Sequence, residues 1–149
     1  DAYFQGSLGR LSYRTLDFDW QSVDGEFQGC SVMNYSEANV GHTRIADHKY
    51  FEPWSEHSSS VIGIETSREC GVGDIPYYPV RLSDDQQTLA DYVALANDDS
   101  GVSFLGRLGT YRYLDMDATI YEALEASRAA LDLIDKQQRL PAFFRNPLD

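Results

Sequence analysis

Residues 106–117, with the sequence GRLGTYRYLDMD, concentrate two arginines, two tyrosines and two aspartates at one point of the chain. The apolar run before this segment is typical of a strand, and the amphipathic run after it is typical of a helix. The first turn of a helix carries free N–H groups and the positive end of the helix dipole, which suit an anion or an electron-rich cofactor edge. Asp115 or Asp117 could instead cap this helix. A cap alone leaves the neighbouring arginines and tyrosines unexplained, so the junction is a candidate ligand site.

A second polar segment, residues 32–54, contains a candidate phosphate ligand. Arg44 lies between two β-branched residues, where a surface strand would favour lysine or glutamate, and its guanidinium fork could hold a phosphate bidentately. The alternative interpretation is a salt-bridged edge strand. His42 and His48 lie six residues apart without metal-ligand spacing, so we expect no metal site.

Two adjacent tyrosines, Tyr77 and Tyr78, stand between two prolines in the sequence DIPYYPV. Proline restricts the backbone on both sides, which fixes the directions of the two rings. Successive residues of an extended segment point to opposite faces, so one ring could pack while the other faces a cleft. The alternative is that both tyrosines pack against a sheet.

Composition limits the class of protein. The chain has 149 residues, of which 42% are hydrophobic, and its formal net charge is −12. This length is enough for a domain with a core, and the acidity argues against nucleic acid or an anionic membrane as a partner. Two cysteines outside any C-x-x-C pair, no recognisable signal sequence and no apolar run near 18 residues lead us to expect a reduced, cytoplasmic setting.

The order of predicted elements favours an α+β fold with a mainly antiparallel sheet. Alternating and β-branched patterns predict four strands, at residues 9–20, 27–35, 58–68 and 101–108. Residues 43–51 could form a short strand or a helical turn. Helical spacing predicts two helices, at residues 83–98, with Ser83 as N-cap, and at residues 117–136.

Four blocks of sequence together resemble the flavin-dependent UDP-galactopyranose mutases. They are DAYF…LGRLSYRTLDF, GCSVMNYSEANVGHTRIADHKYF, DIPYYPV and FLGRLGTYRYLDMDATIYEAL. They run in the order of the family from Asp1 to about Leu124, with similar spacing. That family interconverts UDP-galactopyranose and UDP-galactofuranose, and its members have a Rossmann-like FAD domain, a helical domain and a sheet domain.

The resemblance implies that this chain is the C-terminal portion of such an enzyme. Residues 1–100 would form part of the sheet domain on the substrate side. Residues 101–149 would form a strand and a helix that return to an FAD domain. The G-x-G-x-x-G fingerprint of that domain does not occur in this chain, so we expect the FAD domain to lie outside it. Without that domain, apolar surface along the last helix would be exposed, and homo-oligomers could form.

The resemblance also assigns residues to the substrate, UDP-galactose in its pyranose or furanose form. Asn34 and Arg44 would lie in the substrate cleft, with Arg44 on the pyrophosphate as the main electrostatic contributor to catalysis. Tyr78 and Tyr113 would contact the diphosphate, Tyr113 close to the sugar.

A further set would contact the FAD cofactor. Arg107 would lie against the flavin. The residues around the start of the last helix would line FAD: Leu114, Asp115, Met116, Asp117 and Thr119.

In the family mechanism, N5 of reduced FAD attacks the anomeric carbon, a flavin–sugar adduct forms as UDP departs, and ring closure through another hydroxyl gives the furanose. The isolated chain is expected to be inactive. The alternatives are a non-catalytic module that binds a nucleotide sugar or a protein, and a flavin oxidoreductase with another substrate.

Overall fold

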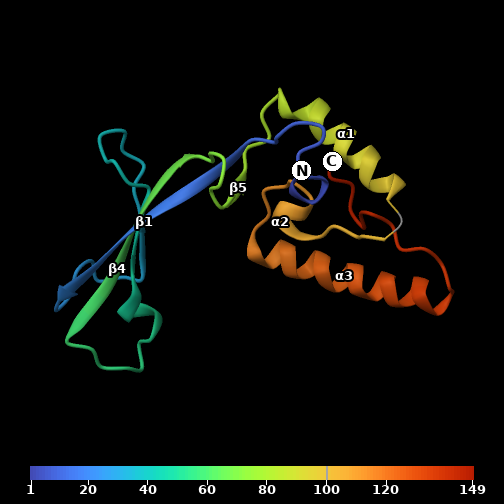
Figure 1. Ribbon diagram of the computed structural model, residues 1–149. Helices are drawn as coiled ribbons and strands as arrows, with labels where there is room; N and C mark the ends of the chain where they lie inside the picture. The colour runs from blue at the N-terminus through green and yellow to red at the C-terminus, as the bar shows by residue number, and fades with distance from the viewer. Residues whose placement is uncertain (100) are drawn as a thin grey trace. The chain divides into compact units, whose positions relative to one another are not determined.

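The computed structural model describes residues 1–99 and 101–149 and confirms the α+β class with an antiparallel sheet. The chain divides into two compact units, and Figure 1 labels several helices and strands that belong to them. Unit 1 consists of Asp1–Arg14 and Cys70–Asp149, and unit 2 consists of Thr15–Glu69. The boundary that we predicted at residue 100, between a sheet-domain portion and the segment that returns to FAD, stays a prediction.

Unit 2 is built on antiparallel strands. Its elements are β1 (Tyr13–Asp24), which begins in unit 1, β2 (Val32–Asn34), β3 (Arg44–Asp47), the 3-10 helix η2 (His48–Phe51) and β4 (Ser59–Glu69). β3 pairs with β2 on one side and with β4 on the other. Both interpretations of residues 43–51 are therefore correct in part, because a strand runs directly into a helical turn. The strand predicted at residues 27–35 is shorter than expected.

A glycine in β4 lets an aromatic side chain lie against the strand. Trp20 lies so close to Gly63 that a Cβ built on this glycine would be 2.7 Å from Cζ3 of the indole. Real Cβ atoms do not approach other atoms so closely, so the indole occupies space that only glycine leaves open.

We therefore expect Gly63→Ala to displace the Trp20 ring and to cost about 1–3 kcal/mol of stability. Tryptophan emission and denaturant unfolding would measure both effects. Gly41→Ala is the matched control, because a Cβ there meets nothing within 4 Å. Equal emission and equal stability of the two variants would contradict the steric argument.

Unit 1 contains the helices. Its elements are the 3-10 helix η1 (Ala2–Phe4), β5 (Tyr78–Pro79), α1 (Asp85–Asp98), α2 (Gly106–Gly109) and α3 (Met116–Asp135). β5 pairs antiparallel with the first two residues of β1. The buried core cluster draws on segments that are distant in sequence: Leu11, Tyr13, Leu89, Tyr92, Val93 and Tyr111.

Two details of the predicted elements in unit 1 are wrong. The strand expected at residues 101–108 is a single bridge between Phe104 and Phe143, followed at once by α2. Gly106 begins α2 with φ +75°, a conformation that interrupts an extended run. At the start of α1, Asp84 rather than Ser83 takes the N-cap position, and the Ser83 hydroxyl donates to the Asp84 carboxylate.

A buried carboxylate ties three distant segments of unit 1 together. Asp85 Oδ1 accepts hydrogen bonds from the backbone N–H and the hydroxyl of Ser12, at 3.1 and 3.0 Å. Asp85 Oδ2 accepts from the Leu82 N–H at 3.2 Å and from the Tyr111 hydroxyl at 2.9 Å. Four donors to one buried carboxylate replace the water that it loses on folding.

The same cluster leads us to expect that unit 1 loses stability in alkali. Burial, followed by the hydrogen bond to Asp85, raises the pKa of Tyr111 from 10.0 to about 12. A pKa that is higher in the folded state gives a stability contribution that is complete below pH 10 and is lost as the pH rises through 12. Helical circular dichroism should therefore fall over this interval. The ultraviolet titration curve of wild type, after subtraction of the curve of Tyr111→Phe, should show one tyrosine ionising near pH 12. A step near pH 10 in this difference curve would contradict the raised pKa of Tyr111.

One face of α3 is apolar and open. Its large apolar side chains are each more than half exposed: Met116, Ile120, Tyr121, Leu124, Leu131 and Ile134. The helix thus has the exposed apolar surface that we expected along it. Within the described part of the chain, no helix is long and apolar enough to cross a membrane.

Candidate functional site

The junction between α2 and α3 turns sharply, and this turn separates the directions of its two tyrosines. Tyr111 has φ +51°, in the left-handed region, and its ring is buried in the core of unit 1. Tyr113, two residues on, is 63% exposed. A left-handed non-glycine residue is held in place by its surroundings, here by the Asp85 cluster. The buried tyrosine thus anchors the segment that presents the exposed one.

Arg107 is the centre of the exposed side of this junction. Its guanidinium carbon lies 4.9 Å from the ring centroid of Tyr113 and 5.1 Å from that of Tyr78. The two rings stack on each other with centroids 5.7 Å apart. Nε of Arg107 donates to the carbonyl of Leu114 at 3.0 Å, and Nη2 donates to the same oxygen.

The charge of Arg107 is fixed in position without being neutralised. Among residues 1–99 and 101–149, the partners of its guanidinium are the two rings and a backbone carbonyl, and no carboxylate pairs with it. Arg10, Arg81 and Arg139 also donate to backbone carbonyls, so the two flanking rings are what distinguish Arg107 from them. A held, unpaired guanidinium beside aromatic rings is suited to an anionic ligand.

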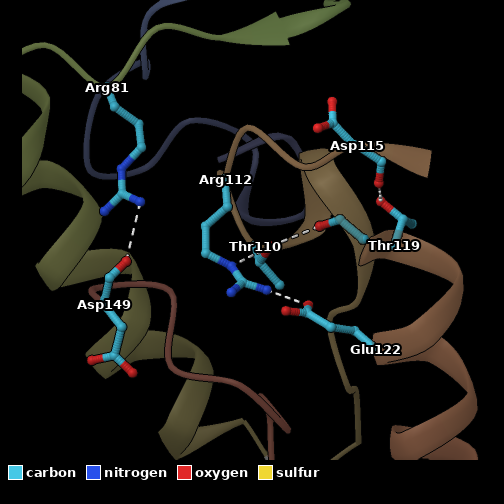
Figure 2. Close-up of polar contacts among 8 residues, drawn as sticks. Arg81, Thr110, Arg112, Asp115, Thr119, Glu122 and Asp149 are labelled. Atoms are coloured by element: carbon cyan, nitrogen blue, oxygen red, sulfur yellow. Dashed lines mark hydrogen bonds and ion pairs between the residues drawn. The ribbon is translucent and has the colours of Figure 1, made fainter. Parts of the chain in front are cut away.

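The start of α3 has its first turn open. Asp115 occupies the N-cap position, but its side chain makes no capping hydrogen bond. Its backbone carbonyl instead accepts from the N–H and the hydroxyl of Thr119, the second of which is drawn in Figure 2. Capping by the Asp115 side chain is therefore wrong as an explanation of this residue. Met116 is 82% exposed, and Asp117 lies in the first turn.

Arg44 lies in unit 2, on β3. Its Nε donates to Asn34 Oδ1 at 2.9 Å, and Nη1 lies 3.7 Å from Glu65 Oε2 on β4. The strand register brings these three residues together, because it places Asn34 opposite Arg44 on one side and Glu65 opposite Arg44 on the other. The alternative interpretation of this segment was a salt-bridged edge strand. It is correct in part, because Arg44 is salt-bridged, but β3 lies between two strands rather than at an edge.

The structure gathers the predicted site residues within each unit. In unit 1 it brings Tyr78, Arg107 and Tyr113 together beside the start of α3, and in unit 2 it joins Arg44 to Asn34. The sequence did not single out Glu65, whose position opposite Arg44 depends on strand register. Tyr77 and Tyr78 are both half-buried, and it is Tyr78 that stacks on Tyr113.

In the described ranges, no three histidine, cysteine, aspartate or glutamate side chains are grouped so that they could hold a metal ion. Cys30 and Cys70 are free thiols.

The strongly acidic α+β chain holds the Arg107 guanidinium beside Tyr78 and Tyr113, an arrangement whose chemistry suits an anionic ligand such as a diphosphate. Comparison with known families makes this specific. The chain belongs to the UDP-galactopyranose mutase family, whose model matches residues 1–113.

Individual relatives agree with this assignment. The chain is 49% identical to a probable UDP-galactopyranose mutase of Klebsiella pneumoniae, over 96% of this chain and 37% of the relative. It is 47% identical to a dTDP-fucopyranose mutase of Escherichia coli, over 86% of this chain and 34% of the relative. A UDP-galactopyranose mutase of Mycoplasma pneumoniae is 31% identical over 88% of the chain. The chain therefore spans about a third of the length of these relatives.

Proposed function

We propose that this chain acts within a longer polypeptide as the substrate-side and cofactor-side portion of a flavin-dependent UDP-galactopyranose mutase. The enzyme would interconvert UDP-galactopyranose and UDP-galactofuranose. Family membership supports the reaction class, and the length of the relatives supports a longer parent. The observation that carries the proposal is Arg107, a guanidinium held by Tyr78, Tyr113 and the Leu114 carbonyl with no carboxylate partner in the described residues.

The chain's own residues would act mainly by binding and orienting the diphosphate. Tyr78 and Tyr113 would donate hydroxyl hydrogen bonds to its oxygens. Arg44, oriented by Asn34 and Glu65, would stabilise the negative charge that grows on the diphosphate as the bond to the anomeric carbon breaks. The reaction then needs no general acid or base from this part of the chain.

The residues around the start of α3 fit an FAD edge. The first turn of α3 is not closed by the Asp115 side chain, Met116 offers an exposed apolar surface, and Arg107 adds a cation. We propose that this set holds the cofactor: Arg107, Leu114, Asp115, Met116, Asp117 and Thr119. When bound in its reduced form, FAD would supply the nucleophile that the ring contraction requires.

A dTDP sugar is the second candidate substrate, because the chain is almost as similar to the dTDP-fucopyranose mutase of Escherichia coli as to the probable UDP-galactopyranose mutase of Klebsiella pneumoniae. Both names describe a hexopyranose carried on a nucleoside diphosphate, so the diphosphate contacts proposed above serve either substrate. A non-catalytic module that binds a nucleotide sugar is the remaining alternative.

The test is to incubate the reduced full-length protein anaerobically with UDP-galactofuranose and, separately, with dTDP-fucofuranose. We expect faster formation of the pyranose from the UDP sugar. Faster turnover of the dTDP sugar would contradict UDP-galactose as the substrate. Failure to convert either sugar nucleotide would favour the non-catalytic module. The 149-residue chain alone, assayed in parallel, should be colourless and inactive, and a yellow purified chain would contradict this.

A further inference from the structure

An ion pair next to the candidate site links the junction to α3. Arg112 Nη2 donates to Glu122 Oε2, and Figure 2 shows this pair between the junction and the second turn of the helix. Both side chains are largely shielded, with 13% of Arg112 and 19% of Glu122 exposed. Low exposure strengthens the attraction between the charges, and it also makes the loss of either partner costly.

The pair is continuous with the first residue of α2. Arg112 Nε donates to the Thr110 hydroxyl at 3.3 Å, as Figure 2 also shows, and that hydroxyl donates to the Gly106 carbonyl at 2.8 Å. The backbone N–H of Arg112 donates to the carbonyl of Arg107 at 3.0 Å. The backbone of Arg112 is therefore linked directly to that of Arg107.

Tyr113 is held from both sides by these contacts. The residue before it, Arg112, is tied to α3 through Glu122, and the residue after it, Leu114, is bound through its carbonyl to Arg107. The ring itself is 63% exposed, so its contacts with Tyr78 and Arg107 and the bonds of the flanking residues, rather than burial, set its direction.

We infer that Arg112 and Glu122 are positioning residues that hold Tyr113 where it receives the diphosphate of the substrate and Arg107 where it lies against the cofactor. The inference rests on the proposed function and adds to it two residues that do not touch the ligand. Another ion pair of α3, Arg128 with Glu125, offers a contrast, because it is formed one helical turn apart on the surface, with Arg128 73% exposed.

The experiment compares Glu122→Gln with the matched control Glu125→Gln in the full-length protein. We expect Glu122→Gln to raise both the Kd for UDP, measured by calorimetry, and KM about tenfold, because small displacements of binding groups weaken binding strongly. The change in kcat should be less than threefold, since contacts made equally in the ground and transition states act on KM. Glu125→Gln should match wild type.

A merely structural role would give a different result, in which kcat per total protein falls while KM and the Kd for UDP stay at wild-type values. That result would overturn the inference. If Glu122→Gln does not fold, Arg112→Lys takes its place, because lysine keeps the cation beside Glu122 and loses the fork that reaches Thr110. Arg112→Lys should raise KM, and unfolding of both variants would assign the pair to stability alone and overturn the inference. A wild-type protein that neither binds UDP nor turns over a nucleotide sugar would instead reject the proposed function itself.

Discussion

Arg44→Ala in the full-length protein is expected to lower kcat/KM for UDP-galactofuranose by about 10²–10³-fold, which is the usual cost of removing one preorganised group that stabilises developing charge. Arg44 is the one guanidinium of unit 2 that we assign to the diphosphate. Asn34 and Glu65 fix its orientation, so its contribution needs little reorganisation during the reaction. The rate of pyranose formation under anaerobic conditions measures the effect.

The fold should survive this substitution, because the Arg44 side chain is 41% exposed. Arg44→Lys keeps the charge without the bidentate fork and should fall between the alanine variant and wild type. Arg128→Ala, on the exposed face of α3, controls for the loss of one positive charge. Wild-type rates for Arg44→Ala would remove this residue from the site.

Asp85→Asn is expected to cause the largest loss of stability, about 3–5 kcal/mol. Asp85 accepts from four donors contributed by Ser12, Leu82 and Tyr111. An asparagine side chain has one oxygen, and its NH₂ group would face donors instead of acceptors. Denaturant unfolding followed by helical circular dichroism would measure the loss, because α1 and α3 both lie in unit 1.

Asp91→Asn is the matched control, since Asp91 is an exposed acid of α1 that accepts a hydrogen bond from Gln87. We expect a change of less than about 0.5 kcal/mol there. If Asp85→Asn were as stable as Asp91→Asn, the buried carboxylate would not hold unit 1 together as described. Because Tyr111 anchors the exposed junction, loss of this cluster should also weaken ligand binding.

Local patterns predicted the helices and one long strand well, whereas the strand expected at residues 9–20 lies four residues further along, at Tyr13–Asp24. The helix expected from residue 117 begins at Met116, and the β-branched run at residues 58–68 forms β4, Ser59–Glu69. These elements carry their own signal, because helical spacing and β-branched side chains are properties of adjacent residues. The strand expected at residues 101–108 failed because a strand also needs a neighbour, and only Phe104 finds one.

The candidate site also has one part that adjacent residues predict and another part that depends on contacts between distant segments. The unusual composition of residues 106–117 predicts a candidate ligand site at the junction from adjacent residues alone. The contacts of Arg107 with Tyr78 and of Asp85 with Ser12 join segments that are distant in sequence, so no local pattern could reveal them. The pair of Arg112 and Glu122 was missed for a similar reason, because an acid in an amphipathic helix ordinarily faces solvent.

The most direct test of the central claim is a comparison of reduced and oxidised full-length protein with UDP-galactofuranose, with both samples kept free of oxygen and the sugar nucleotides separated by chromatography. The proposed function predicts UDP-galactopyranose from the reduced sample and little or none from the oxidised one. Equal conversion by the two samples, or none in either, would contradict a flavin-dependent mutase.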